Sequence, residues 1–233
     1  MKRVAIIQSD YIPWKGYFDI IRSVDEFILL DCVQYTRRDW RNRNRICTER
    51  GLSWLTIPVE TKGRYYQKIN EVKVADRGWS KRHWKRIEAA YSRAPFFEQY
   101  GGRFREAYDN AAGMQMLSRV NLHFITLVND ILDTKTPVVP SPPRYDGEDR
   151  NRRLISICRH AGADEYLTGP SAMDYLDAEQ FAAEGISILW ADYSGYPEYS
   201  QLHTPFRHDV SIIDLIFNTG PSAPSYMKKL AWT

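Results

Sequence analysis

The sequence predicts an α/β fold of three layers, with helices on both faces of a mostly parallel sheet. Three observations support this prediction. An apolar strand, a short helix and a second apolar strand open the chain, a similar set of elements closes it, and a helix-rich stretch lies between them. Such alternation is typical of parallel strands joined by crossover helices. We therefore expect one α/β domain over residues 1–233, with a helical insertion or subdomain over about residues 75–140.

The first unit consists of two short apolar runs with a helix between them. Residues 2–7 and 26–31 have the length of buried strands, and residues 16–24 have the spacing of a short helix. We expect the two strands to pair in parallel through a right-handed crossover. Residues 52–59 predict a further strand.

The middle of the chain is predicted to be mainly helical. Residues 80–91 and 114–133 each carry apolar side chains at spacings of three and four, which is typical of a helix with one buried face. Four prolines and a run of charge then occupy residues 137–151, which predict an irregular connection.

The last third repeats the alternation of the first. The predicted elements are a helix over 152–163 that stops at Gly162, a strand over 165–169, a helix over 177–185, a strand over 186–193 and a helix over 211–220. The final helix begins with Ser211 and Asp214, which we interpret as a capping box.

Composition excludes several classes of protein. Apolar residues make up 43% and charged residues 26%, and no apolar run reaches the roughly 18 to 20 residues of a membrane helix, so we expect no membrane insertion. The first residues lack a signal-peptide pattern, which favours the cytoplasm. Three cysteines without CxxC spacing argue against a disulfide framework, and no His, Cys or acidic residues stand at metal-ligand spacing, so we expect no metal.

Polar residues follow each of the four predicted parallel strands. They are Gln8, Ser9 and Asp10; Asp31 and Gln34; Thr168, Gly169, Pro170 and Ser171; and Asp192 and Tyr193. Because ligands of parallel sheets bind beyond the carboxyl ends of the strands, the coincidence predicts a site at this edge. The alternative is that these are ordinary turn residues.

Residues 39–46, DWRNRNRI, alternate arginine with asparagine. In an extended chain Arg41, Arg43 and Arg45 share one face, and Asn42 and Asn44 share the other. Guanidinium groups pair with phosphate or carboxylate, and amides can bind a sugar, an amide or a base edge. The pattern favours a small anionic substrate such as a nucleotide-linked molecule; a solvated basic loop is the alternative.

His83 lies on the predicted basic helix, next to Trp84. A neutral imidazole among cations would be an available general base, and the alternative is an ordinary surface histidine. Walker, GxGxxG and GxSxG motifs are absent, so the familiar phosphate-loop, dinucleotide and hydrolase signatures give no guidance.

Several motifs together resemble the WbqC-like protein family. They are Q-x-x-Y-x-P-W-x-G-Y-F from Gln8 to Phe18, FILLDCVQYTRRDWRNRNRI, WLTIPV, YLTGPSAMDYL and YSQLHTPFRHDVSIIDLIFNTGP. The resemblance spans Val4 to Pro221, and the Asn/Arg run is its most specific part. Where the family commonly has a paired Asp-Asp, this chain has Asp31 and Cys32.

The resemblance implies a bacterial transferase of polysaccharide or specialised-metabolite biosynthesis, which moves an acyl or aminoacyl group to an amino sugar or related amine. It implies an activated donor, either an acyl thioester or an aminoacyl group, with a carrier protein or tRNA as alternative carriers. The strand-turn-helix opening is also similar to the nucleotidyltransferase (HUP-like) superfamily, where an HxGH turn grips ATP. Here PWKG stands in that place, so ATP remains an alternative cofactor.

The predicted catalytic residues of an N-acyltransferase are Asp31 or His83 as base and Asn42 as an oxyanion donor. The residues predicted to bind substrate are Gln8, Asp10, Tyr11, Trp14, Gln34, Arg41, Arg43, Asn44, Arg45, Gly169 and Ser171. Two other functions stay open. One is an ATP-dependent ligase or nucleotidyltransferase, and the other is a nonenzymatic nucleic-acid-binding protein with basic clusters and aromatic side chains.

Overall fold

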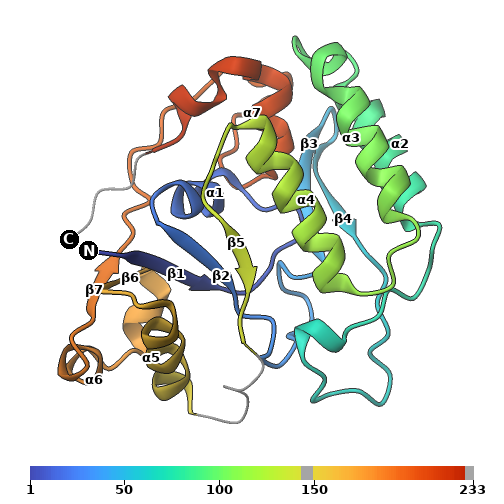
Figure 1. Cartoon of the computed structure of the whole chain (residues 1–233). Coiled ribbons are helices and arrows are strands. Elements are labelled where there is room, and N and C mark those ends of the chain that lie inside the picture. The colour runs from blue at the N-terminus through green and yellow to red at the C-terminus, as the bar shows by residue number, and fades with distance from the viewer. Residues whose placement is uncertain (143–148, 229–233) are drawn as a thin grey trace.

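A computed structural model describes residues 1–142 and 149–228 of the chain, and a five-stranded parallel sheet lies at its centre (Figure 1). The strands are β1 (Arg3–Ile7), β2 (Glu26–Leu29), β5 (Val138–Pro140), β6 (Glu165–Thr168) and β7 (Ser187–Trp190). Their order across the sheet is β5-β2-β1-β6-β7, and every neighbouring pair is parallel. The predicted α/β class is confirmed.

Side chains alternate between the two faces of the sheet, and helices cover both. Val4 and Ile6 of β1 pack in one apolar cluster with α5 (Arg150–Ala161) and α6 (Ala178–Ala183). Ala5, between them, packs in the other cluster with α1 (Lys15–Arg22) and α7 (Ile212–Thr219). The sheet is therefore the middle layer of three, as predicted.

The order in which strands are added to the sheet reverses at β1. Strands β2 and β5 are added on one side of β1, and the later strands β6 and β7 are added on the other side. Helix α1, after β1, lies on one face, and α5, before β6, lies on the opposite face. The carboxyl ends of β1 and β6 consequently form a topological switch point, where the following segments diverge and leave a crevice.

A two-stranded antiparallel hairpin lies beside the sheet. It consists of β3 (Arg43–Thr48) and β4 (Gly51–Thr56), and Gly51 has φ 95° next to the turn. The strand predicted over 52–59 is thus the second strand of this hairpin. Strand β3 was predicted only as extended chain, because its alternating Arg and Asn side chains lack the apolar period of a typical strand.

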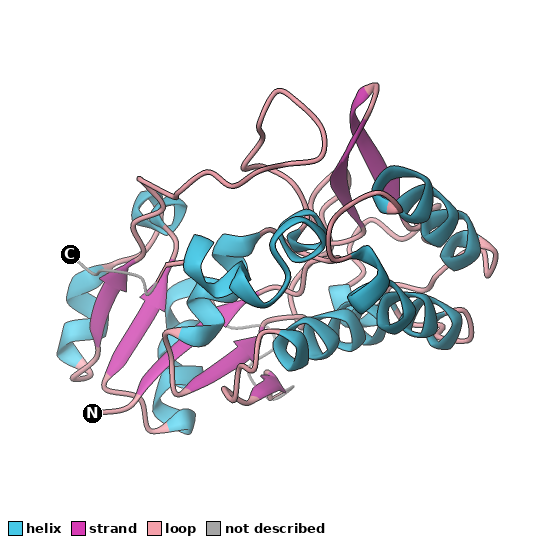
Figure 2. Ribbon diagram, turned by 90° about the horizontal axis from the view of Figure 1, so that it is seen from above, coloured by secondary structure: helices cyan, strands magenta, loops and turns pink. Residues whose placement is uncertain are grey.

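Three helices lie next to the hairpin: α2 (Trp79–Tyr91), α3 (Phe97–Ala111) and α4 (Leu117–Ile131). Helix α2 packs against β3, α3 packs against α2, and α4 packs against α3. Figure 2 shows these helices and the hairpin at the end of the molecule away from the sheet. Their buried side chains, such as Phe124, share one apolar cluster with Phe18 of α1 and Phe27 of β2. Helix α3 was not predicted, because charged residues and the pair Gly101 and Gly102 interrupt its apolar pattern.

Two predictions need correction. Residues 138–140 were expected in an irregular connection but form β5, which pairs with β2 and is too short and proline-flanked to show a strand pattern. The capping box is incomplete. Ser211 accepts from the Ile213 N–H, but the Asp214 carboxylate accepts from Tyr91 and Tyr199 hydroxyls inside the core. Residues 143–148 of the expected connection lie outside the described residues.

Within residues 1–142 and 149–228, no helix has the length and apolar character needed to cross a bilayer.

Candidate functional site

A cavity of about 630 Å³ opens at the switch point of the sheet. Gln8 and Asp10 line it from the end of β1, and Thr168 and Gly169 line it from the end of β6. We call this cavity the crevice. Its position is the one at which open parallel sheets bind ligands, since loops and helix starts converge there.

Two arginines at the start of α5 give the crevice a basic wall. Arg150 and Arg153 both line it, and the Arg150 guanidinium lies 4.2 Å from the centroid of the Tyr175 ring. The helix begins at its N-cap Asp149, whose side chain accepts from the Asn151 and Arg152 N–H groups. Neither arginine was predicted as a site residue. The sequence signal that could have identified them is Asp149, because an N-cap at this residue places Arg150 and Arg153 in the first turn of the helix that leads to β6.

The opposite wall is aromatic and comes from the start of α1. Trp14 and Tyr17 line the crevice, and the Trp14 ring meets Tyr193 edge-on at 5.2 Å between centroids. A Cβ at Gly16 would collide with the Trp14 indole, so glycine allows this ring to lie against the backbone. The Tyr17 hydroxyl donates to the Gln8 carbonyl at 3.1 Å, which fixes the end of β1.

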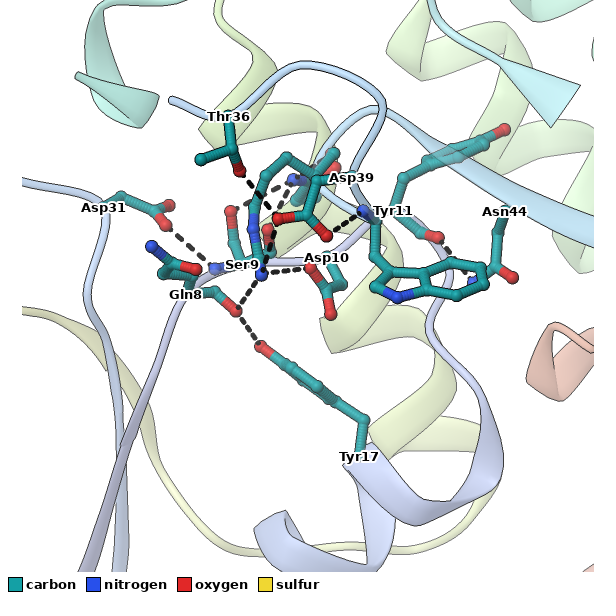
Figure 3. A network of polar contacts seen from close by, with 12 residues as sticks. Gln8, Ser9, Asp10, Tyr11, Tyr17, Asp31, Thr36, Asp39 and Asn44 are labelled. Atoms are coloured by element: carbon teal, nitrogen blue, oxygen red, sulfur yellow. Dashed lines mark hydrogen bonds and ion pairs between the residues drawn. The ribbon is translucent and has the colours of Figure 1, made fainter. Parts of the chain in front are cut away.

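Asp10 and Arg41 form an ion pair at the end of β1. Arg41 also donates to the Gln8 carbonyl at 3.4 Å, and its second amino group lies 3.6 Å from Asp39 (Figure 3). Burial raises the pKa of Asp10 to about 6; Arg41 opposes this shift, and the neighbouring Asp39 and Asp31 add to it. Asp10 is therefore a carboxylate that can accept a proton near neutral pH.

Asp31 and Asn121 hold the Ser9 segment in place behind the crevice. The Asp31 carboxylate accepts from the Ser9 N–H at 2.9 Å, and burial raises the pKa of Asp31 (Figure 3). Asn121, fully buried on α4, donates to the Ser9 carbonyl at 3.2 Å and to the Arg41 carbonyl at 2.9 Å. Asp31 is not among the lining residues of the crevice, and its carboxylate is engaged with Ser9.

His83 is buried, in contrast to the exposed position expected on a basic helix. Its Nε2 lies 3.1 Å from the Thr56 carbonyl, which can only accept, so Nε2 carries the proton. Nδ1 therefore accepts from the Tyr11 hydroxyl at 2.8 Å, and the Tyr108 hydroxyl donates to Tyr11 at 2.6 Å. Burial lowers the pKa of His83 to about 4. Both ring nitrogens are occupied, and neither His83 nor Tyr11 lines the crevice.

The two asparagines of the Asn/Arg run support the backbone. Asn42 donates to the Ile57 carbonyl at 2.8 Å. Asn44 donates to the Tyr11 and Ile12 carbonyls at 3.1 and 2.8 Å, and Ile12 has φ 40°, which is unusual for a β-branched residue. Asn44 thus stabilises a strained turn directly after Asp10.

The arginines of the run are each paired. Arg43 lies 4.2 Å from the Trp54 ring and donates to the Arg38 carbonyl. Arg45 donates to Asp209 at 2.7 Å. Both contact Trp54 on one face of β3, which confirms the predicted alternation, but Arg43 does not line the crevice. Of the three arginines of the run, Arg41 lines the crevice, where it is paired with Asp10, and Arg43 and Arg45 do not.

A second, smaller cavity of about 240 Å³ adjoins the first, and we call it the tryptophan cavity. Its lining residues are Asp10, Pro13, Trp14, Trp40, Asn44, Arg45, His208 and Asp209. Asp10 and Trp14 line both cavities, so they form the boundary between them.

The structure thus gathers most of the predicted substrate-binding residues at one edge of the sheet. Those that line the crevice are Gln8, Asp10, Trp14, Gln34, Arg41, Gly169 and Ser171. Gln34 also donates to the Tyr65 carbonyl at 2.9 Å. Asn44 and Arg45 line the tryptophan cavity instead, whereas Asp31, His83, Asn42, Tyr11 and Arg43 line neither. In the part of the chain that the structure describes, no group of three His, Cys, Asp or Glu side chains could hold a metal.

Comparison with known proteins gives two matches. The model of the WbqC-like protein family matches residues 8–226. The chain is 43% identical over 228 residues to "Uncharacterized protein Rv1507c" of Mycobacterium tuberculosis (strain ATCC 25618 / H37Rv), with 98% of each chain covered. No solved structure gives a significant match.

Proposed function

The chain belongs to the WbqC-like protein family, and we propose that it is a transferase that moves an acyl or aminoacyl group to the amine of a phosphate-bearing substrate. The observation that carries the proposal is the position of Asp10. It lies at the switch-point crevice, beside an arginine and opposite the basic wall of α5. The proposed setting is bacterial polysaccharide or specialised-metabolite biosynthesis, with a nucleotide-linked amino sugar or related amine as acceptor.

The basic wall supports an anionic substrate. Arg150 and Arg153 come from the first turn of α5, and Thr168 and Ser171 add hydroxyl groups on the β6 side of the crevice. Guanidinium and hydroxyl groups at a switch point suit the phosphates of a nucleotide-linked molecule. In this proposal Arg150 and Arg153 replace Arg43 and Arg45 as the phosphate-binding arginines.

Asp10 is the proposed proton acceptor, in place of Asp31 and His83. The amine nitrogen attacks the carbonyl carbon of the donor and forms a C–N bond, and the amine proton passes to Asp10. The bond between that carbon and the leaving sulfur or oxygen breaks, and Asp10 returns the proton to the leaving group. A positioned base of this kind contributes about 10² to 10⁴ in rate.

The donor is proposed to be an acyl thioester or an aminoacyl ester, delivered on a carrier protein or on tRNA as alternatives. The Gln8 amide and the Ser171 hydroxyl line the crevice near the strand ends and are candidates to donate to the oxyanion.

An ATP-dependent ligase is the second candidate, because the two arginines of α5 at the switch point would suit a triphosphate equally well. Release of pyrophosphate on addition of ATP and Mg²⁺, with no need for a thioester donor, would favour this candidate over the transferase.

The experiment is a transfer assay with the Asp10→Asn variant. The wild-type protein is incubated with nucleotide-linked amino sugars and a panel of acyl thioesters and aminoacyl-tRNAs, and products are identified by mass spectrometry. Asp10→Asn keeps the size of the side chain and should lower turnover at least a hundredfold. Asp192→Asn is the matched control, because Asp192 follows β7 but is exposed and caps Ser194. Equal turnover of the two variants would exclude Asp10 as the base.

A further inference from the structure

We propose that the tryptophan cavity binds a single hydroxylated ring that carries a free amine, and that it holds this amine at Asp10. The inference rests on the proposed function, since it places the acceptor group of that reaction. It assigns a ligand class to a cavity that is separate from the phosphate-binding wall of the crevice.

The size of the cavity limits its ligand. Its volume of about 240 Å³ is below the roughly 300 to 1,000 Å³ typical of pockets for drug-sized molecules, so it suits one ring rather than a nucleotide. The adjoining crevice, with about 630 Å³, has room for the remainder of a nucleotide-linked substrate.

The walls combine indole rings with polar groups. Trp14 is held by edge-on contact with Tyr196 at 5.6 Å, and Trp40 lies against Trp54 at 5.5 Å. Aromatic faces attract the apolar C–H surface of a saturated ring and also attract an ammonium group. Between the rings, carboxylate and amide oxygens can accept from hydroxyl groups.

The lining offers carboxylates that can accept from an amine or a hydroxyl group. Asp10 and Asp209 both line the cavity, and each is held by an arginine, Asp10 by Arg41 and Asp209 by Arg45. The hydrogen bond from Arg207 is the main reason that the pKa of Asp209 lies below its usual range, so this carboxylate stays ionised. Burial and the nearby Lys15 lower the pKa of His208, so the imidazole is neutral at pH 7.

Two polar atoms in this lining have no hydrogen-bond partner among the described residues. They are Nε of Arg45 and Nδ1 of His208, and both are buried. Buried polar groups are nearly always paired, so a bound hydroxylated molecule or water is the expected partner after a small adjustment of these side chains.

The boundary residues explain how the two cavities act together. Because Asp10 and Trp14 line both, a nucleotide-linked amino sugar can place its phosphates at the α5 wall and its ring in the tryptophan cavity. Linking two binding groups in one molecule raises affinity above that of either fragment. We therefore expect UDP-glucosamine to bind more tightly than UDP or glucosamine alone.

The test measures dissociation constants of UDP, UDP-glucosamine and UDP-N-acetylglucosamine for the full chain and for the Trp40→Ala variant. Tyr66→Ala is the control, because Tyr66 is also an exposed aromatic side chain but lies outside both cavities. Circular dichroism and thermal melting confirm that each variant is folded.

In the wild type, UDP-glucosamine should bind at least fivefold more tightly than UDP and than its N-acetyl analogue. Trp40→Ala should remove that advantage and leave the affinity for UDP within twofold, and Tyr66→Ala should change neither. An unchanged advantage in folded Trp40→Ala would overturn the inference, as would tighter binding of the N-acetyl compound. If the wild type binds UDP but binds UDP-glucosamine no more tightly, the inference about the tryptophan cavity is wrong and the proposed function is unaffected. If the wild type does not bind UDP, the result counts against the proposed function.

Discussion

Asp10 and Arg41 form a nearly buried ion pair at the carboxyl end of β1, with side chains 14% and 11% exposed. The pair places a carboxylate where the two cavities meet. Its partner Arg41 is anchored to the same strand end through the Gln8 carbonyl, so the carboxylate is held in a fixed position. A preorganised base next to two cavities is the arrangement on which the proposed transfer depends.

The pH dependence of transfer should report Asp10. Because burial raises its pKa to about 6 and the ionised form is the base, kcat/KM should rise more steeply with pH below about pH 6 than above it. Initial rates between pH 4.5 and 8 measure this profile. The Asp10→Asn variant should lose the change of slope near pH 6. If the residual activity of that variant still changes slope there, the titrating group is not Asp10.

Removal of one arginine from the α5 wall should weaken phosphate binding. Arg150→Ala is expected to raise the Kd for UDP at least about tenfold, because a charge-assisted hydrogen bond is worth about 1.5 to 3 kcal/mol. Isothermal titration calorimetry gives the value. Arg159→Ala is the matched control, since Arg159 is exposed on the same helix and pairs with Glu184. Equal Kd values for both variants and the wild type would place the phosphates elsewhere.

His83 should govern stability rather than chemistry. Burial lowers its pKa from 6.5 to about 4, so the unfolded chain binds the proton more readily. The contribution of neutral His83 to the free energy of unfolding is fully present above about pH 6.5 and is lost as the pH falls toward 4. The loss amounts to about 3 kcal/mol.

Urea unfolding at pH 7 and pH 4.5 tests this prediction with His83→Gln. The wild type should lose more unfolding free energy between the two values than the variant does. His123→Gln on α4 is the control, because His123 is half-buried and donates to the Ala107 carbonyl at 3.0 Å. An identical loss in wild type and His83→Gln would contradict the assignment.

Asn121 should be a positioning residue. Asn121→Ala leaves the Ser9 and Arg41 carbonyls without their donor inside the protein and should cost about 1 to 3 kcal/mol of stability. Because the same bonds fix the segment that carries Asp10, turnover should fall at temperatures well below the Tm. Asn110→Ala, at an exposed site on α3, should change neither quantity. Full turnover of folded Asn121→Ala would show that this support is dispensable.

The sequence alone was sufficient to predict four of the five strands of the sheet and its polar edge. Strands β1, β2, β6 and β7 are short apolar runs, and the polar residues after them meet because parallel strands end at the same edge. Strand β5 was missed since it is three residues long and relies on pairing with β2 for its conformation.

The roles of individual polar residues could not be predicted in the same way. His83 is surrounded in sequence by lysines and arginines, but its own face of α2 turns inward to Tyr11. Arg43 and Arg45 were expected to be available to a ligand, but Trp54, on the neighbouring strand of the hairpin, packs against Arg43, and Asp209, from a distant segment, pairs with Arg45. Such partners are set by tertiary packing, which local patterns do not encode.

A crystal structure of the protein with UDP-glucosamine would show directly whether the acceptor amine lies at Asp10. The phosphates should lie against Arg150 and Arg153 in the crevice, with the glucosamine nitrogen about 2.6 to 3.2 Å from the Asp10 carboxylate. Phosphates bound outside the crevice, or an amine directed away from Asp10, would contradict this arrangement.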